Sequence, residues 1–399
     1  MVAEERDVVV VGSGAAGLTA AIEAAMVAPT VLLTDRALGR SNTALAQGGL
    51  QVPFDTDRSR ESLVRDMVTS ARSPVQLDRV ERFVAEILPT VRRLEEWGLV
   101  LDRDERGELV RRTAGGLSEQ RIVSARDQIG PALLDVLKRA LASSGADVHP
   151  GQRVVSVSSG SGAVELGVVS GDGRRSVRAK AVVVCSGGIS ARFAAQRGER
   201  TTNQPNDNDR LFDQLRGLGL QLVEPDAYQY HPFGLVEVEG AAGRCIPESV
   251  VNFPIRLLDR SRRPITEDIR QDRYSLTHRI FDVAEAGEAH EVSAGRGVWL
   301  TLSEVDPAEL ADVFPKLRRT LERCGWVGDD VLVYPFLHYY LGGFAVGRDG
   351  QTHVPGLYLA GEMVGGLHGL NRLMGNGLTD SLVHGRLAGR AAARHALAS

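Results

Sequence analysis

Short apolar runs alternate with a helix-like segment at the start of the chain. Asp7 is followed by four valines that end at Val11, and the segment TVLLTD (residues 30–35) is similarly apolar. Unbroken runs rich in β-branched residues are typical of strands that are buried on both faces of a parallel sheet. The alanine-rich segment LTAAIEAAM (residues 18–26) between them has helical composition. This pattern predicts a strand–helix–strand unit.

The turn after the first predicted strand has the sequence GSGAAG (residues 12–17). Glycines in this spacing allow a tight turn, a close approach of the backbone to a pyrophosphate, and close packing of the helix on the strand. The helix N-terminus also offers free N–H groups and the positive end of its dipole to a phosphate. The unit therefore predicts a dinucleotide site formed by Gly12, Gly14, Ala15, Ala16 and Gly17.

The end of the second predicted strand provides candidate ribose ligands. Asp35 lies 21 residues beyond Gly14, where an acidic side chain accepts hydrogen bonds from ribose hydroxyls. Thr34 lies equally close to the strand end, so the choice between these two residues stays open. The loop RSNTALAQGGL (residues 40–50) follows, and its polar, glycine-containing sequence suits a second phosphate or a ring.

The middle of the chain changes from helical to strand-like periodicity. Apolar residues recur at spacings of three and four in residues 75–97 and 131–144, which predicts two helices. From Arg153 onward the strand-like runs are VVSVSS, AVELGVVS and SVRAKAVVVCSGG, separated by GSG and GDG. The GDG turn predicts a hairpin. The last run ends in glycines, as the first strand does, and we expect it to return to the parallel sheet.

The remaining segments predict an insertion. Residues 222–334 contain mixed polar strands, several prolines and arginine-rich turns, which indicates an α+β domain. The segment HVPGLYLAGE (residues 353–362) is again typical of a buried strand, and a helix follows from about Gly377. We therefore predict an α/β fold. It comprises a discontinuous, Rossmann-like nucleotide-binding domain with a β-meander (residues 1–221 and 335–399) and an inserted α+β capping domain (residues 222–334).

Composition and charge narrow the classes of function. Of the 399 residues, 43% are apolar and 25% are charged, as in ordinary globular proteins, and the net charge of −4 argues against a nucleic-acid-binding surface. Cys185, Cys245 and Cys324 offer neither a disulfide framework nor a CxxC metal pair, which favours a reducing, cytoplasmic location. The segment MVAEERD has no signal-peptide h-region, and no apolar run approaches the ~18 residues of a membrane span, so we expect no membrane association.

Three basic side chains lie at the predicted junctions between the domains. His231 lies in YQYHPFG, His338 in PFLHYYLGG, and Arg372 in HGLNRLMGNGL. Ligands of open α/β sheets bind beyond the carboxyl ends of the strands, and domain junctions are preferred pocket sites, so we expect these residues to converge. Arginine binds carboxylates in a bidentate manner and histidine can donate to a second carboxylate. The alternative is structural: packed histidines, and an arginine that caps a helix or pairs with Asp380.

The motifs of several other mechanisms are missing from the sequence. It contains no GxSxG, HExxH or GxxxxGK[ST] segment. Cys185 has no assigned base, and we interpret it as a buried packing residue. Redox chemistry by a bound cofactor therefore remains the favoured mechanism.

Nine segments, in order along nearly the whole chain, carry a specific resemblance to a known family. They are VVVVGSGAAGLTAA, SNTALAQGGL, GGLSEQRIVSARDQIG, VVVCSGG, TTN, YQYHPFG, LHYYLGGF, GLYLAGE and GLHGLNRLMGNGL. Together they resemble the FAD-dependent family that contains L-aspartate oxidase and the flavoprotein subunits of succinate dehydrogenase and fumarate reductase. SNTALAQGG and LHGLNRLMGNGL resemble the oxidase branch most.

The resemblance implies that the cofactor is FAD in an extended form. Succinate dehydrogenases carry a histidine for covalent flavin attachment where this chain has Asn42, so we expect non-covalent FAD. In the family pattern, Gln47 lies near the flavin ring and Glu362 binds the ribityl chain. The expected cofactor-binding residues are Gly12, Gly14, Ala15, Ala16, Gly17, Thr34, Asp35, Ser41, Asn42, Thr43, Gln47, Gly48, Gly49, Asp209, Gly361, Glu362, Asn376, Gly377 and Leu378.

The resemblance also implies an enzyme that acts on a small dicarboxylate or amino dicarboxylate. The expected catalytic residues are His231, His338 and Arg372, which would bind carboxylates, and Arg273 at the proton-transfer position. Because arginine normally stays protonated, an electrostatic role for Arg273 and a surface position for it both stay open. A hydride would pass to the flavin, and O₂ or a small electron acceptor would reoxidise it, since the chain has no Fe–S cysteine set. L-aspartate oxidase is the nearest named activity.

The chain departs from the family pattern at several positions. Residues 251–254 read VNFP where the family has R-G-E-G, so we expect the proton relay to be lost. Ala114 replaces a glutamate associated with the substrate amine, Leu117 replaces a histidine, and Tyr274 replaces an aspartate. The family's C-terminal helical domain is expected to be absent.

Because of these departures, two alternative functions stay open. One is a fumarate reductase-like, succinate dehydrogenase-like or specialised oxidoreductase of a modified acid. The other is a degenerate flavin-binding regulator. The sequence does not predict the exact substrate, the direction of reaction or the oligomeric state.

Overall fold

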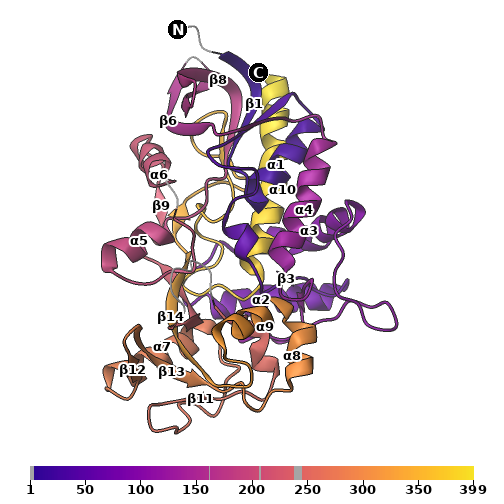
Figure 1. The fold of residues 1–399 in the computed structure, drawn as a ribbon. Helices are drawn as coiled ribbons and strands as arrows, with labels where there is room; N and C mark the ends of the chain where they lie inside the picture. Colours follow the sequence, from indigo (N-terminus) through magenta and orange to yellow (C-terminus); the bar gives the residue numbers. More distant parts are fainter. Residues whose placement is uncertain (1–3, 161, 206–207, 238–244) are drawn as a thin grey trace.

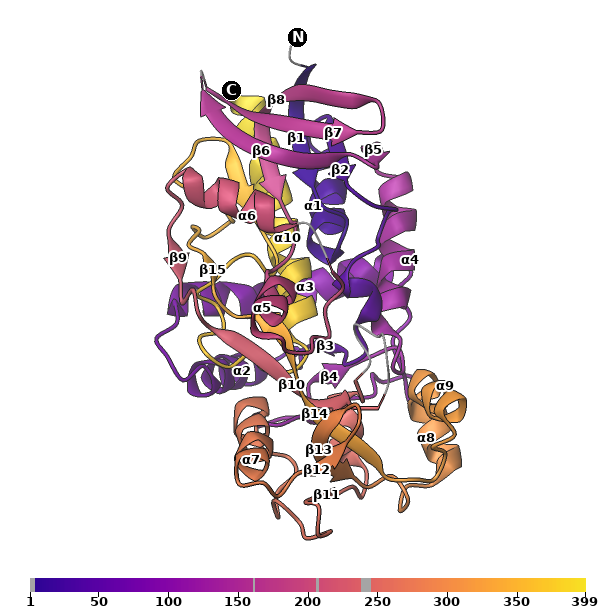
Figure 2. The same cartoon turned by 60° about the vertical axis from the view of Figure 1, so that its left-hand side comes forward.

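The computed structural model describes residues 4–160, 162–205, 208–237 and 245–399. Its elements form an upper body, which contains the larger sheet and both the first strand and the last helix, and a lower body with a smaller sheet (Figure 1, Figure 2). The strands of the larger sheet are β1 (Glu4–Val11), β2 (Thr30–Thr34), β5 (Asp147–Pro150), β6 (Arg153–Gly160), β7 (Ala163–Ser170), β8 (Gly173–Val184) and β16 (Leu357–Leu359). The helices outside the lower body are α1 (Ala15–Ala25), α2 (Asp57–Ser70), α3 (Leu77–Glu96), α4 (Ile129–Ala142), α5 (Ser190–Arg197), α6 (Asn208–Gly217) and α10 (Asn376–Ala398).

The chain also has further short elements. They are the 3₁₀ turn η1 (Asn42–Leu45) and the strands β3 (Leu50–Gln51), β4 (Ile122–Val123), β9 (Leu222–Val223) and β15 (Gly343–Phe344). The lower body consists of β10 (Tyr228–Leu235), η2 (Glu248–Asn252), β11 (Leu257–Leu258), α7 (Arg273–Glu285), β12 (His290–Val292), β13 (Gly295–Leu300), α8 (Pro307–Val313), α9 (Pro315–Cys324) and β14 (Val331–Tyr340).

The N-terminal unit folds as predicted, with β1 and β2 paired in parallel and joined by α1. A Cβ atom at Gly12, whose φ is +105°, would lie 2.4 Å from the carbonyl oxygen of Cys185. A Cβ atom at Gly17 would lie 1.9 Å from the carbonyl oxygen of Gly12. Both glycines are therefore required because α1 begins directly against the ends of the strands.

Strand β8 connects the parallel part of the large sheet to the predicted meander. Its first half pairs antiparallel with β7, which pairs antiparallel with β6, and this confirms the predicted hairpin at the GDG turn and the β-meander. Its last residues pair in parallel with β1 on one side and with β16 on the other. The strand order β5-β2-β1-β8-β7-β6, with β16 beside β8, confirms that the upper body is assembled from both halves of the chain.

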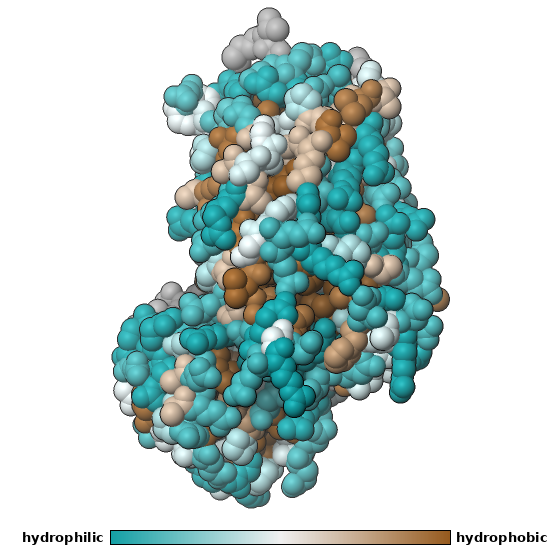
Figure 3. Space-filling model, turned by 90° about the vertical axis from the view of Figure 1, so that its right-hand side faces the viewer, coloured by the Kyte–Doolittle hydropathy of each residue, from teal (hydrophilic) through white to brown (hydrophobic). Residues whose placement is uncertain are grey.

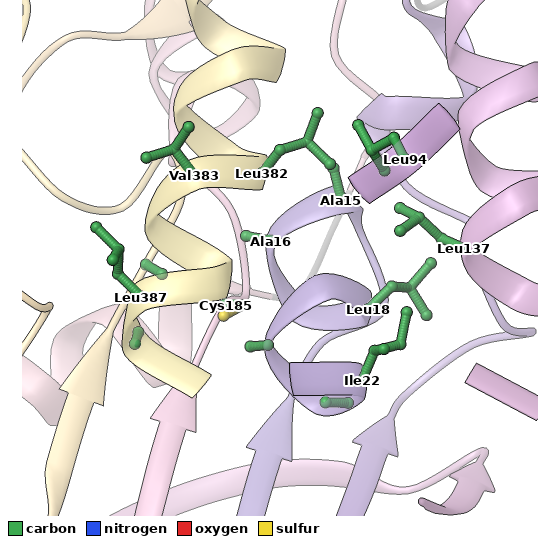
Figure 4. Packing of buried hydrophobic residues seen from close by; sticks show 14 of the residues in the cluster. Ala15, Ala16, Leu18, Ile22, Leu94, Leu137, Cys185, Leu382, Val383 and Leu387 are labelled. Carbon is green, nitrogen blue, oxygen red and sulfur yellow. The ribbon is translucent and has the colours of Figure 1, made fainter. Parts of the chain in front are cut away.

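Helix α10 packs directly on α1 through small residues. Cβ atoms at Gly385 and Gly389 would lie 2.4 Å and 2.3 Å from the carbonyl oxygens of Ala16 and Ala20. Figure 4 shows Leu382 and Leu387 of α10 in the same apolar cluster as the residues of α1. The last helix therefore supports the first one, beside the glycine-rich turn.

The lower body has its own apolar core beneath an antiparallel sheet. The strand order is β10-β14-β13-β11, with β12 beside β13, and its buried residues include Phe233, Ile280 and Val298. The α/β class, the meander and the inserted α+β unit are confirmed by this arrangement. Strand β14 crosses the predicted boundary between residues 334 and 335, so the domain boundary itself stays a prediction. In Figure 3 this body is a separate lobe with a mainly hydrophilic surface.

A buried carboxylate joins the two bodies. The side chain of Asp127, directly before α4, accepts hydrogen bonds from the backbone N–H groups of Lys316 (3.1 Å) and Leu317 (2.8 Å) at the start of α9. Burial raises the pKa of this carboxyl group, and the N–H groups act in the opposite direction. Asp127 therefore caps a helix of the lower body from the upper body.

Within the part of the chain that the structure describes, every helix is too short or too polar to cross a membrane.

We expect Asp127→Ala to lower the free energy of unfolding by about 0.5–2 kcal/mol, the usual cost of a lost helix cap. Asp127→Asn keeps one acceptor oxygen and should lose less. Thermal unfolding followed by circular dichroism measures both variants. An Asp127→Ala protein as stable as the wild type would show that this cap does not hold the bodies together.

Candidate active site

A cleft opens at the carboxyl ends of the parallel strands, directly over the glycine-rich turn. Its empty volume is about 1070 Å³, including the open mouth. The predicted nucleotide-binding residues that line it are Gly12, Gly14, Ala15, Ala16, Thr34, Asp35, Ser41, Asn42, Thr43, Gly361 and Glu362. Parallel sheets bind ligands at this edge, so the sequence located the cleft correctly.

The structure distinguishes Thr34 from Asp35 at the end of β2. The Thr34 hydroxyl is buried and lies 2.9 Å from the Ser13 hydroxyl, which also accepts the N–H of Gly39. Asp35 is exposed at the rim of the cleft, 3.6 Å from the Arg36 guanidinium. Asp35 is therefore the freer acceptor for ribose hydroxyls.

The start of α1 suits a pyrophosphate. Gly14 is the N-cap and makes no side-chain capping bond, and the Ala15 N–H donates to the Thr43 hydroxyl at 3.0 Å. The glycines leave no side chain between the backbone and the cleft, and Arg36, Arg40 and Arg153 also line it. Helix N–H groups and cations beside a glycine turn are the donor set that a dinucleotide diphosphate requires.

A second cavity of about 980 Å³ continues from the first between the two bodies. Asn42, Thr43, Glu362 and Ser381 line both. All the predicted catalytic residues line the second cavity, namely His231, Arg273, His338 and Arg372. The sequence therefore predicted this convergence correctly, although these residues lie far apart along the chain.

The two histidines lie on the paired strands β10 and β14, with their ring centroids 5.2 Å apart. Nδ1 of His231 accepts the backbone N–H of Phe233 at 3.3 Å, so Nε2 carries the proton in the neutral ring. Nδ1 of His338 lies 2.7 Å from the Thr202 hydroxyl. Burial, followed by the charges of Arg273 and other basic neighbours, holds the pKa of both rings well below the usual value. Both histidines are therefore neutral donors at pH 7.

Arg372 is a buried cation without a carboxylate partner among the described residues. Its Nη1 donates to the carbonyl of Leu373 at 3.2 Å, its guanidinium lies 4.4 Å from the centre of the Tyr339 ring, and its Nε has no partner there. Burial, together with Arg273, lowers the pKa of Arg372 to about 10, so it stays charged at pH 7.

The structure does not support the predicted alternative that Arg372 pairs with Asp380. The carboxylate of Asp380 instead contacts His368, at 3.2 Å, and His384. Arg372 therefore lines the second cavity without a carboxylate partner among the described residues.

Arg273 is buried at the start of α7, so the surface position considered for it is wrong. Its Nε donates to Oε2 of the buried Glu248 at 2.8 Å, and Nη2 contacts the same oxygen. A carboxylate therefore lies beside Arg273 although residues 251–254 read VNFP, because Glu248 lies three residues before that segment, and the loss of the proton relay stays a prediction. The acidic residue in the segment PES (residues 247–249) was the sequence signal available for this partner. Its pairing with Arg273 follows only from the fold, which places η2 against the start of α7.

The remaining predicted cofactor residues lie close to the second cavity, with three exceptions. Gln47, Gly48, Gly49, Gly377 and Leu378 line it. Gly17 packs on Gly12 instead of lining a cavity, and Asn376 is buried with both amide atoms unpartnered among the described residues. Asp209 lies in the first turn of α6, but its side chain is outside the described part of the chain.

Glu362 is partly buried where the two cavities meet. Its Oε1 accepts the backbone N–H of Tyr340 at 3.0 Å and contacts the Ser190 hydroxyl at 3.4 Å. Burial raises the pKa of Glu362 to about 7 in spite of these bonds. A carboxyl group with this pKa can present either a donor or an acceptor to a bound hydroxyl near neutral pH.

Several lining residues were not predicted from the sequence. They include Ser13, Gln152, Arg153, Ser186 and Gln204 in the first cavity, and Thr202, Asn203, Cys245, Glu248, Tyr339 and Met374 in the second. Thr202 and Asn203 belong to the TTN motif, which could have indicated them. Ala114 does not line either described cavity and packs with Ile122 and Met374.

Comparisons with known proteins agree with this geometry. A family model described as FAD binding domain matches residues 7–378. A fumarate reductase (CoM/CoB) polypeptide of Methanothermobacter marburgensis is 30% identical over 415 residues, covering 99% of this chain and 74% of that protein. The L-aspartate oxidase of Mycobacterium tuberculosis H37Rv is 31% identical over 403 residues, covering 98% and 74%. A solved structure of a mutant E. coli quinol fumarate reductase FrdA has a TM-score of 0.90 at 25% identity, covering 100% of this chain and 71% of that one.

We expect Glu362→Gln to change how stability depends on pH. Because the folded-state pKa of Glu362 is raised from 4.5 to about 7, the wild-type protein loses stability relative to the variant as pH rises through this window. Between pH 4 and pH 8, the free energy of unfolding of the variant relative to the wild type should rise by about 3 kcal/mol at most. Urea unfolding of both apoproteins at the two pH values measures it, and a gain that does not grow with pH would contradict the raised pKa.

Proposed function

The chain belongs to the family of FAD-dependent oxidoreductases that includes L-aspartate oxidases and fumarate reductase flavoprotein subunits, and we propose that its substrate is a small dicarboxylate or amino dicarboxylate. The observation that carries this proposal is the buried guanidinium of Arg372 without a carboxylate partner in the described chain. A buried charge of this kind is costly unless an anion pairs with it. His231 and His338 supply neutral donors for a second carboxylate in the same cavity.

FAD is the cofactor that the family and the first cavity imply. Its pyrophosphate would lie at Gly12–Gly17 and the start of α1, its ribose at Asp35, and its ring against the glycines of residues 48–49 and 377. When bound, it supplies the acceptor or donor of a hydride. The Asn42 side chain is an amide held by Asn203 and Gln204, and it offers no nucleophile for a covalent bond to the ring. Non-covalent binding is therefore part of the proposal.

The chain's own residues orient the substrate and handle its proton. Arg372 would bind one carboxylate, while Nε2 of His231 would donate to the other, as would Nε2 of His338 in the tautomer in which Nδ1 accepts from Thr202. Arg273 would face the substrate carbon, with Glu248 neutralising its charge and fixing its guanidinium plane. The Oε2 atom of Glu248 is the proton acceptor within reach of Arg273, and the buried position of the pair excludes competing water.

One observation favours the second candidate, a dicarboxylate that lacks an amine. The carboxylates that line the second cavity in the described chain are Glu248, which Arg273 occupies, and Glu362, which accepts the Tyr340 N–H. Ala114 stands where the resemblance places the glutamate for the amine, and it packs away from the cavity lining. A substrate ammonium would therefore lack a free carboxylate, which favours succinate or fumarate chemistry over aspartate oxidation.

Steady-state and anaerobic assays with aspartate, succinate and fumarate should separate these functions. We expect at least one acid to exchange electrons with the flavin, followed by its absorbance. Peroxide formed with aspartate supports the oxidase, with O₂ as the acceptor. Reoxidation of the reduced flavin by fumarate without O₂ supports the second candidate. Flavin that responds to none of the acids in either direction would indicate a flavin-binding regulator.

Arg372→Ala should weaken substrate binding by about 2–4 kcal/mol, because it leaves a buried carboxylate unpaired. Flavin content, measured from the visible spectrum, should not change. Arg93→Ala, which removes an exposed ion pair with Glu96 on α3, is the control. Unchanged kinetics in the Arg372 variant would exclude this residue from the substrate site.

A further inference from the structure

Gln229 contacts both arginines of the site, although it does not line the cavity itself. It lies on β10, two residues before His231, and is 4% exposed. Its Oε1 accepts from Nη1 of Arg273 at 2.9 Å. Its Nε2 donates to the carbonyl of Arg372 at 3.0 Å and to Oδ1 of Asn371 at 3.0 Å. Among the described residues, no other side chain hydrogen-bonds to both arginines.

The hydrogen-bonding partners leave the Gln229 amide only one orientation. A guanidinium only donates and a backbone carbonyl only accepts, so the oxygen must face Arg273 and the nitrogen must face Arg372. The orientation of Asn371 follows, because its Oδ1 receives the Gln229 bond. Its Nδ2 therefore donates, to Ser70 at 2.9 Å and to Oδ1 of Asp272 at 3.0 Å.

Asp272 closes this network into a ring. Its carboxylate caps α7 by accepting the Ser275 N–H at 3.2 Å, and Arg72 donates to it at 2.9 Å. The next residue along the chain is Arg273, whose guanidinium donates to Gln229. The series of hydrogen bonds therefore returns to its starting point. The ring therefore joins α7 of the lower body to the loop that carries Arg372, and every hydrogen bond in it has a fixed direction.

We propose that Gln229 is a positioning residue that holds Arg273 and Arg372 at a fixed separation through the polarity of its amide. The inference rests on the proposed function, because the two arginines are the groups assigned to the substrate and its proton. Gln229 itself contacts neither the cavity nor the reacting atoms. Its amide oxygen accepts from the Arg273 guanidinium, and its amide nitrogen donates to the backbone carbonyl of Arg372 and to Asn371.

Two substitutions separate polarity from packing. In Gln229→Glu, a carboxylate still accepts from Arg273 but places oxygen against the carbonyl of Arg372 and Oδ1 of Asn371. A protonated carboxyl group again has one donor and one acceptor, so the defect should recover in acid. Gln229→Met has a similar size with neither a donor nor a comparable acceptor, so its defect should persist at every pH.

Other charged and ionisable groups also surround this position in the wild type. They are Arg273 and Asp272 around the start of α7, Glu248 on η2, Arg372 in the loop before α10, Arg72 after α2, and His231 and His338 on the sheet. Each variant is therefore compared with the wild type at the same pH. Gln351→Glu, in an exposed loop, controls for the added charge.

The test measures the dissociation constant of malonate by titration calorimetry on the flavin-loaded proteins at pH 5.5 and pH 8. At pH 8 both Gln229 variants should bind malonate about tenfold more weakly than the wild type, the usual effect of leaving a buried polar group unpaired. At pH 5.5 the deficit of Gln229→Glu should shrink several-fold, while that of Gln229→Met stays. The proposal is overturned if Gln229→Met binds malonate within twofold of the wild type. It is also overturned if the loss of affinity in Gln229→Glu is the same at both pH values.

A second measurement decides the inference if the wild type does not bind malonate, a result that would count against the proposed substrate class. If the amide polarity of Gln229 matters, the difference in unfolding temperature between the wild type and Gln229→Glu should be smaller at pH 5.5 than at pH 8. A difference that is the same at both pH values overturns the inference. A Gln229→Glu protein that takes up flavin at pH 5.5 but not at pH 8 supports the inference. One that folds at neither pH, while Gln229→Met folds, contradicts it.

Discussion

A positive charge buried without an anion is the constraint on which the site depends. Transferring a guanidinium from water into a protein interior is costly, and the described residues around Arg372 offer only a carbonyl and the face of Tyr339. The neighbouring groups do not add a second free charge, because Glu248 neutralises Arg273 and the histidines are neutral. Arg372 is therefore the cation of this cavity that has no carboxylate partner among the described residues, and an anionic ligand would offset the cost of burying it.

The scaffold holds this cation from several directions. The loop before α10 is fixed where the Arg79 guanidinium donates to the carbonyl of Gly365 at 2.8 Å and where His368 contacts Asp380. Arg79 belongs to α3, and Asp380 belongs to the first turns of α10. The position of the Arg372 guanidinium thus depends on α3 and α10, which lie far apart along the chain. The site therefore forms only when both parts of the discontinuous upper body are assembled.

The sequence predicted the position of a residue correctly where the residues next to it in the chain indicate its structural role. The valines of β1, the glycine-rich turn and the histidines beside sheet strands all follow local rules, and the structure confirms their positions. Glu248 was missed because its pairing with Arg273 depends on a turn 25 residues away. Gln229 was missed because a neutral amide in a strand carries no chemical signal until both of its partners are placed. Ala114 shows the converse: a substitution that matters in an alignment can lie outside the cavity lining.

The contact of α10 with α1 has a consequence for how the protein matures. Because Gly385 and Gly389 press on Ala16 and Ala20, the nucleotide cleft rests on a helix made more than 350 residues after the turn that forms its floor. More than 350 residues are therefore synthesised between the glycine-rich turn and the helix that supports it. Until α10 has been synthesised, the glycine turn of a nascent chain lacks this support.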